Sequence, residues 1–387
     1  MAEHLTRHIT SLMTDHLTRQ IATHGGDVWQ VAEELGIPAS KVALELLDFS
    51  ANINPRGLPP RAMARLTRDA ADSRLLRLYP DPSARCLRNA LGERLAVSPA
   101  AIVVGPGAEA LLSPILRCLH SKRALVPVPA FSEYRRVCAQ QGVEFVRFPL
   151  DRAEWFRIPA ERFCARIEKE RCDVVFLNNP HNPSGAMLEA REVRQILDAT
   201  RSIGATLILD EAFIDYAPRA SLVSEAAGRQ GLIVVRSLTK FYGCPALRVG
   251  YAVAHPETIH SVMETLPTWP VTQLAMDALA DAVGDREYAD ASVRENAVER
   301  ERLCESLGEL GLVVFPSAAN YLLLGLAAGM PAASELRARL ISKHRILIRN
   351  CDSYEGLEAG RYVRVAVRPG EENARLVRAI GEELKGL

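Results

Sequence analysis

The stretch RSLTKFYGCPALRVGY, residues 236–251, overlaps the end of the apolar run LIVVRS and places four reactive or anion-binding side chains in one short segment. Lys240 is preceded by the hydroxyl residues Ser237 and Thr239, and Arg248 follows a few positions later. An amine can condense with a carbonyl group, while hydroxyls and a guanidinium bind phosphate. The segment therefore predicts a site for a phosphorylated carbonyl compound.

The sequence on either side alternates short β-branched or apolar runs with longer amphipathic segments. Segments 109–119 and 189–203 are among the predicted helices, and the predicted buried strands are 101–105, 124–128, 173–177, 205–210, 232–237 and 248–254. This alternation is typical of an α/β protein whose mostly parallel sheet is covered by helices on both faces. Such sheets bind ligands at the carboxyl ends of their strands.

Three regions are predicted along the chain. Residues 1–54 comprise an N-terminal extension and an arm that leads to the substrate, residues 55–272 a large α/β domain, and residues 273–387 a smaller α+β domain. HLTR occurs at both His4 and His16, and two copies are too few for a repeat architecture. We expect residues 1 to about 22 to be a mobile or partly helical extension.

Composition limits the partners and the compartment. Lys plus Arg and Asp plus Glu each total 47 of the 387 residues, so no net charge attracts nucleic acid or an anionic membrane. No run is long and apolar enough to cross a bilayer, and the N-terminus lacks the apolar core of a secretory signal. Eight cysteines without a CxxC pair predict neither a metal site nor a redox motif, and the cytoplasm is the expected location.

Other polar signals also follow predicted strands. Asp210 ends the run 205–210, NNPHNPSG (178–185) follows another strand, and GPGAEA (105–110) opens a helix whose N–H groups can bind an anion. Each signal alone has an ordinary explanation as a surface charge, a helix cap or a turn. Together they provide what pyridoxal 5′-phosphate requires: an amine for its aldehyde, here Lys240, and a carboxylate, here Asp210, that keeps its pyridine nitrogen protonated.

With these motifs the chain resembles the fold type I pyridoxal-phosphate enzymes of the class I/II aminotransferase family, from about Thr23 onward. The resemblance implies catalytic roles for Lys240 and Asp210 in the large domain. It further implies that Asn182 binds the phenolic oxygen of the cofactor and that Phe131, in PAFSEY, stacks on its ring. The residues implied to hold the phosphate are Gly107, Ala108, Ser237, Thr239 and Arg248.

Two further positions bear on this resemblance. Tyr79, in RLYPDP, matches a tyrosine that reaches the phosphate in the neighbouring subunit, which implies a homodimer with shared active sites. Many relatives carry DEAY, whereas this chain has DEAF, so Phe213 lacks the hydroxyl that contacts the phenolic oxygen. Asn182 is then the identifiable donor to that oxygen.

Within the family, two groups act on phosphorylated amino compounds. The chain is more similar to the L-threonine O-3-phosphate decarboxylases of cobalamin biosynthesis than to the histidinol-phosphate aminotransferases. The motifs that match are THGGD (23–27), LLDFSANINPRGLP (46–59), LILDEAFIDY (207–216), RSLTKFYGCPALRVGY (236–251), ANYLLL (319–324) and RILIRNCDSYEGL (345–357). The implied product is (R)-1-amino-2-propanol O-2-phosphate. An aminotransferase for histidinol phosphate is the alternative, and a cofactor-binding protein without catalysis is a third hypothesis.

The choice between these reactions depends on how the substrate is oriented, because the Cα bond perpendicular to the cofactor ring breaks most easily. Arg349 and Arg364 can each grip a carboxylate or a phosphate through a bidentate fork. The resemblance assigns Arg364 chiefly to the carboxylate and Arg349 to the end of the substrate that includes the phosphate. His24, Ser50 and Asn52 would complete the pocket, although each is also explained as a cap or turn residue.

Overall fold

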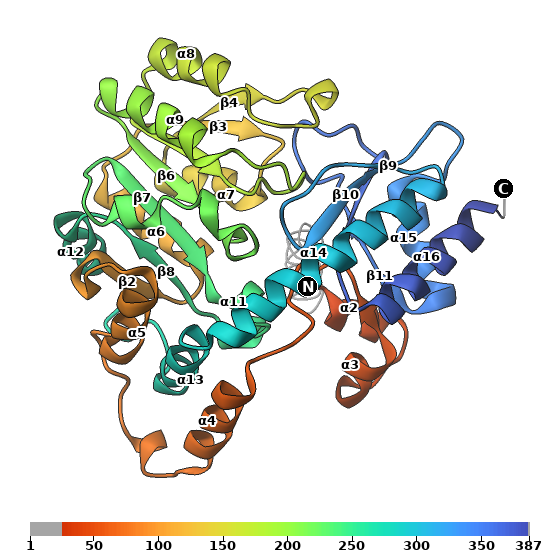
Figure 1. Ribbon diagram of the computed structural model, residues 1–387, viewed down its shortest axis with the longest axis horizontal. Coiled ribbons are helices and arrows are strands. Elements are labelled where there is room, and N and C mark those ends of the chain that lie inside the picture. Colours follow the sequence, from red (N-terminus) through yellow and green to blue (C-terminus); the bar gives the residue numbers. More distant parts are fainter. Residues whose placement is uncertain (1–24, 386–387) are drawn as a thin grey trace, which may run out of the picture.

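The computed structural model describes residues 25–385. The N-terminal extension and the predicted substrate contact His24 lie outside the described residues. All six predicted strands join one seven-stranded sheet, whose strand order is β2 (Ile102–Gly105), β8 (Gly250–Val253), β7 (Leu232–Ser237), β6 (Thr206–Asp210), β5 (Val174–Asn178), β3 (Arg123–Val128) and β4 (Glu144–Pro149) (Figure 1). Six of the seven strands run in the same direction, and β8, between β2 and β7, runs in the opposite one. The sequence analysis missed β4, an edge strand in which exposed residues are interspersed with buried ones.

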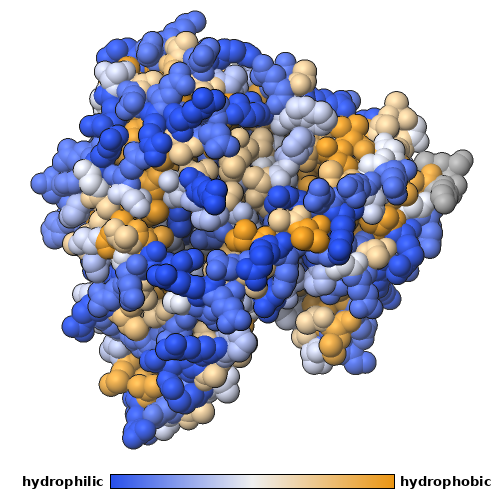
Figure 2. Space-filling view, in the orientation of Figure 1, coloured by the Kyte–Doolittle hydropathy of each residue, from blue (hydrophilic) through white to orange (hydrophobic). Residues whose placement is uncertain are grey.

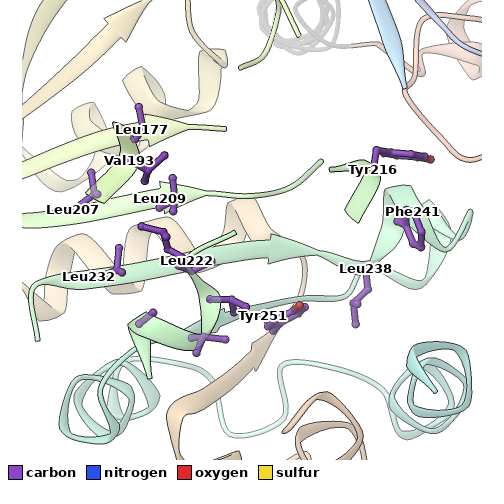
Figure 3. Packing of buried hydrophobic residues seen from close by; sticks show 14 of the residues in the cluster. Leu177, Val193, Leu207, Leu209, Tyr216, Leu222, Leu232, Leu238, Phe241 and Tyr251 are labelled. Atoms are coloured by element: carbon purple, nitrogen blue, oxygen red, sulfur yellow. The ribbon is translucent and has the colours of Figure 1, made fainter. Parts of the chain in front are cut away.

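Alternating side chains of the strands enter two separate cores. In β5, Val175 and Leu177 enter the core on one face of the sheet, and Val174 and Phe176 enter the core on the other. The first core includes residues of α5 (Arg85–Leu95), α8 (Ala160–Glu170), α9 (Ala190–Ser202) and α13 (Gln273–Val283). Figure 3 shows part of this core, with Leu177, Leu207 and Leu209 of the sheet and Val193 of α9 among the labelled residues. The second includes residues of α6 (Ala108–Cys118), α7 (Ser132–Gln141) and α12 (Pro256–Glu264). Both faces are therefore covered by helices, as expected.

A second, antiparallel sheet lies in the C-terminal part of the chain. It has four strands in the order β12 (Arg349–Asn350), β13 (Tyr362–Ala366), β10 (Tyr321–Gly325) and β9 (Val313–Val314). Its core includes residues of α14 (Arg286–Glu309), α15 (Ala333–His344) and α16 (Gly370–Lys385). The long helix α14 connects the two units: Tyr288 packs in the first core of the large sheet, and Leu303 packs in that of the small sheet (Figure 1).

The chain segment that precedes the large sheet in the sequence lies alongside the small, C-terminal unit for part of its length. It contains α2 (Val28–Glu34), α3 (Val42–Glu45) and β1 (Leu47–Asp48), and β1 pairs in parallel with β11 (Ile346–Leu347). The chain then crosses to α4 (Pro60–Ala71), which lies beside α13 (Figure 1). The short helices α10 (Val223–Ala226) and α11 (Leu238–Phe241) flank β7 in the sequence. The arm is thus held by the small unit while its end reaches the large one.

The visible surface is mostly hydrophilic, with apolar groups that include some near α4 and the loop after it (Figure 2). That loop contains the exposed residues Leu75, Leu76, Leu78 and Tyr79. Within residues 25–385, no helix combines the length and the apolar character needed to span a membrane. Over the same range, no group of three or more His, Cys, Asp or Glu side chains is placed to hold a metal ion.

Candidate active site

The predicted site lies where three central strands end. Asn178, Asp210 and Ser237 are the last residues of β5, β6 and β7, and Asn178 is paired in register with Asp210. The helix α11 begins directly after Ser237 and carries Lys240. A cavity of about 500 Å³ opens at this edge. Its lining includes all the predicted cofactor contacts except Tyr79, namely Gly107, Ala108, Phe131, Asn182, Asp210, Ser237, Thr239, Lys240 and Arg248.

Lys240 has the properties of a reactive amine. Its Nζ lies 3.5 Å from the Ser237 Oγ and 5.7 Å from the ring centre of Phe213. The interior position disfavours the charged ammonium and lowers the pKa of Lys240 to about 8; Asp210 opposes this shift, and Arg248 and Arg364 add to it. A substantial fraction of the amine is therefore neutral, and hence nucleophilic, near neutral pH.

This pKa predicts how fast the cofactor-free chain takes up pyridoxal phosphate. We expect the rate of covalent uptake to rise about tenfold from pH 6 to pH 7 and about fivefold from pH 7 to pH 8, in step with the neutral fraction of the Lys240 amine, and to level off above pH 8. Reduction with borohydride followed by peptide mass analysis measures uptake at Lys240. A rate that keeps rising to pH 10 would contradict the lowered pKa. In the control Asp210→Asn, the levelling point should move to lower pH, because the opposing carboxylate is gone.

Asp210 is held by a residue that the sequence analysis did not single out. The Tyr134 hydroxyl donates to Asp210 Oδ2, and the Ala212 N–H donates to Asp210 Oδ1 at 2.9 Å. Burial raises the pKa of Asp210, and the hydrogen bond from Tyr134 opposes this shift. The Tyr134 ring stacks on Phe176 at 4.9 Å between centroids and meets the edge of Phe131 at 5.7 Å. Tyr134 follows Phe131 by three residues, and this helical spacing was the available signal.

The part of the cavity lining that contains Ser237, Thr239 and the start of α6 forms a cradle that suits a phosphate. The Ser237 and Thr239 hydroxyls are 2.8 Å apart, and α6 begins at Ala108 with its N–H groups at the cavity. Glycine is required at two places in the cradle. Gly107 has φ +108°, and a Cβ on Gly250 would lie 2.2 Å from the Ala108 nitrogen. With Arg248 beside Gly107, the donors and the available space fit the phosphate of pyridoxal 5′-phosphate.

The neighbours of Asp210 and Ser237 form a buried ion pair beneath the cavity. Glu211 follows Asp210, Arg236 precedes Ser237, and Arg236 Nη2 lies 2.8 Å from Glu211 Oε2. Glu211 also accepts the Ser221 hydroxyl at 2.7 Å. Because both charges are paired and hydrogen-bonded, the pair fixes the ends of β6 and β7 relative to each other.

The predicted substrate arginines lie together at the small unit. Both side chains are buried, Arg349 at the start of β12 and Arg364 in β13, and these two residues are paired in register. Arg364 Nη1 donates to Asn182 Oδ1 at 2.5 Å, which connects the small unit to the cofactor side of the cavity. Arg349 donates to the Ser353 hydroxyl at 2.6 Å.

The remaining predicted contacts, Ser50, Asn52 and Tyr79, lie in three different surroundings. The Ser50 hydroxyl donates to Asp48 and accepts the Gly26 N–H at 2.7 Å, so it holds the arm, while its carbonyl accepts from Arg364 at 3.2 Å. Asn52 is buried outside the lining of the cavity, and its Oδ1 has no hydrogen-bond partner among residues 25–385. Tyr79 is 77% exposed and stacks on Trp269 at 4.4 Å, and it is not part of the cavity lining within one chain.

Phe213 is buried in an aromatic pair. Its ring meets the edge of Tyr321 at 5.0 Å, and the Tyr321 hydroxyl donates to the His181 carbonyl at 2.9 Å. Tyr321 therefore does not replace the hydroxyl that Phe213 lacks. Asn182, which lines the cavity, stays the predicted donor to the phenolic oxygen.

Comparison with known proteins agrees with this site. Residues 45–380 match the family described as aminotransferase class I and II, and the chain belongs to this family. It is 35% identical over 370 residues to the threonine-phosphate decarboxylase of Salmonella typhimurium, which covers 95% of this chain and 98% of that protein. The family predicted from the sequence is therefore confirmed.

Two solved structures have the same architecture. The histidinol-phosphate aminotransferase from Sinorhizobium meliloti, in complex with pyridoxal 5′-phosphate, has a TM-score of 0.82 and 25% identity, and covers 92% of this chain and 94% of that one. The L-threonine-O-3-phosphate decarboxylase from Porphyromonas gingivalis has a TM-score of 0.77 and 25% identity, and covers 88% of this chain and 100% of that one. The predicted fold type I architecture is confirmed.

Proposed function

We propose that this protein decarboxylates L-threonine O-3-phosphate to (R)-1-amino-2-propanol O-2-phosphate with pyridoxal 5′-phosphate as its cofactor, as a step of cobalamin biosynthesis. The observation that carries the proposal is the 35% identity to a threonine-phosphate decarboxylase over nearly the whole of both chains. The cavity supports it, because an amine, a carboxylate and a phosphate cradle meet there beside two buried arginines.

The bound cofactor would supply an aldehyde for the substrate amine and a ring that accepts the electrons of the breaking Cα bond. Asp210 keeps the ring nitrogen protonated, since the raised pKa of Asp210 reflects a buried carboxyl group that gains from a cationic neighbour. Arg364 holds the carboxylate, Arg349 holds the phosphate end, and Asn52, whose amide oxygen has no hydrogen-bond partner among residues 25–385, belongs to the substrate side of the site. With a pKa of about 8, Lys240 can return a proton to Cα after CO₂ leaves.

We further propose a cytoplasmic homodimer with the three-region organisation given above. All eight cysteines are free thiols, which suits a reducing compartment. The exposed Tyr79 and Trp269 offer a stacked aromatic surface to a second copy, and a partner's tyrosine at this place would complete the phosphate cradle. Although α13 starts at Gln273, it packs in the core of the large sheet, so we place the working boundary of the small unit near the start of α14.

A product assay tests the reaction. The protein with pyridoxal phosphate and L-threonine O-3-phosphate should release CO₂ and aminopropanol phosphate in equal amounts. Histidinol phosphate with 2-oxoglutarate, run alongside, should give no glutamate. Glutamate formation without CO₂ release would favour the histidinol-phosphate aminotransferase activity that the Sinorhizobium meliloti relative carries in its name.

A further inference from the structure

The loop between β12 and β13 reaches from the small unit onto the large one. Glu355, in this loop, pairs with Arg135 of α7 at 2.5 Å and also with Arg147 of β4. The next residue, Gly356, packs on the large unit so closely that a Cβ there would lie 3.3 Å from the Pro129 nitrogen. The loop is therefore fixed beside the cavity, and it carries Tyr354, a residue with no role assigned above.

Through one hydroxyl, Tyr354 connects Arg364 of the small unit with Asn182 in the lining of the cavity. The side chain is buried, and its Oη donates to Asn182 Oδ1 at 3.0 Å. The same Oη accepts a hydrogen bond from Arg364 Nη1 at 2.8 Å. The Tyr354 ring also lies under the Arg349 guanidinium, 5.6 Å from its central carbon. One tyrosine thus contacts both predicted substrate arginines and the predicted cofactor contact.

These bonds fix the orientation of the Asn182 amide. A guanidinium has donors only, so the amide atom that faces Arg364 and Tyr354 is the oxygen. The Nδ2 group must then point the other way, at the cavity that Asn182 lines. With Phe213 unable to donate, this NH₂ group is the donor that the phenolic oxygen of the cofactor would meet.

The same bonds determine which edge of Arg364 is left for a ligand. Nη1 is engaged by both Asn182 and Tyr354, whereas Nη2 has a single bond of 3.2 Å to the Ser50 carbonyl. Nε is buried and has no hydrogen-bond partner within the described part of the chain. A carboxylate binds a guanidinium by two parallel hydrogen bonds, and the Nε and Nη2 edge is the one whose donors are less fully used within the described residues.

We propose that Tyr354 is a positioning residue that holds the cofactor-facing amide of Asn182 and the carboxylate-binding edge of Arg364 in one fixed relative orientation. That orientation decides whether the bond from Cα to the carboxylate stands perpendicular to the cofactor ring. The part that concerns the reaction rests on the proposed function. The claim that Tyr354 orients Asn182 does not rest on it, because the affinity for the cofactor alone tests that claim.

The test compares Tyr354→Phe with Tyr362→Phe, a matched loss of a hydroxyl from another buried tyrosine of the small unit, one that packs on Phe315 and Arg152 instead of the cavity. For Tyr354→Phe we expect kcat/KM for L-threonine O-3-phosphate to fall about 10- to 100-fold, the effect of losing a hydrogen bond to a charged group. The dissociation constant of pyridoxal phosphate, measured by fluorescence of the cofactor-free protein, should rise several-fold. Compared with the unmodified protein, a larger share of turnovers should also end in transamination, which leaves the amino group on the cofactor and releases no CO₂.

The outcomes separate this proposal from the proposed function. If Tyr354→Phe matches Tyr362→Phe in cofactor affinity and in kcat/KM, or if only its melting temperature falls, Tyr354 has no positioning role. If the unmodified protein releases no CO₂ from L-threonine O-3-phosphate, the proposed function fails. The cofactor affinities of the two variants then still decide whether Tyr354 orients Asn182.

Discussion

Replacing Lys240 by alanine should abolish the visible absorbance that pyridoxal phosphate acquires when it binds covalently, and should lower turnover by more than about 10³-fold. Among residues 25–385, Lys240 is the one lysine in the lining of the cavity, and its Nζ lies 3.5 Å from the Ser237 Oγ. Its loss removes both the covalent anchor and the group placed to return a proton. Absorbance spectra and CO₂ release from the purified variant measure the two effects.

The matched control for this substitution is Lys343→Ala. Lys343 lies on α15 and pairs with Glu383 at 2.8 Å, so its loss removes an amine without affecting the cavity. We expect the control to keep its absorbance and turnover. A Lys240→Ala protein that keeps the covalent band would show that another amine holds the cofactor and would overturn the assignment of Lys240.

Replacing Asp210 by asparagine should lower turnover by about 10²- to 10³-fold, in the range for removal of one preorganised electrostatic group. Asparagine keeps nearly the same shape, and its one amide oxygen can still accept the Ala212 N–H, while its NH₂ group would donate to the Tyr134 hydroxyl instead of accepting from it. It cannot hold the pyridine nitrogen in its protonated form, so the ring would accept electrons less readily. CO₂ release at saturating substrate and saturating cofactor measures this effect separately from weaker binding.

Two further measurements separate loss of ring-nitrogen protonation from loss of stability in the Asp210→Asn variant. Its melting temperature without cofactor should be equal to or higher than that of the unmodified protein, because a buried carboxylate is replaced by a neutral amide. Adding an N-methylated cofactor analogue, whose ring nitrogen is permanently cationic, should recover part of the lost turnover. Unchanged turnover in the variant would mean that Asp210 does not control the ring nitrogen.

The central strands and the residues at their ends could be predicted because their signals are local. Buried parallel strands have continuous apolar sequences, and Asp210 and Ser237 follow directly on two of them. The edge strand β4 was missed because it carries exposed charges within a short segment.

The supporting tyrosines could not be assigned from the sequence, for a physical reason. Tyr134 contacts Asp210 across 76 residues, and Tyr354 contacts Asn182 across 172. Nothing in the local pattern around either residue specifies such a partner, because the Tyr134 contact exists only after the large unit has folded, and the Tyr354 contact only after the two units have packed together. The hydroxyl of Ser50 illustrates the converse, since a residue predicted to face the substrate uses its side chain to anchor the arm.

The buried pair of Glu211 and Arg236 has a consequence for how this protein can change over evolution. At the ends of the adjacent strands β6 and β7, Asp210 and Ser237 face the cavity. Their immediate neighbours, Glu211 and Arg236, form the buried ion pair. A substitution at either charge would shift Asp210 or Ser237 as it destabilised the chain, so the cofactor side resists gradual variation. The loop that carries Tyr354 is held instead by the exposed ion pairs of Glu355 with Arg135 and Arg147, and the arm by hydrogen bonds such as that of Ser50 with Asp48, and such surface interactions tolerate substitution more readily. New substrates and new reactions should therefore arise there, and a library aimed at altering the reaction should be confined to those two segments.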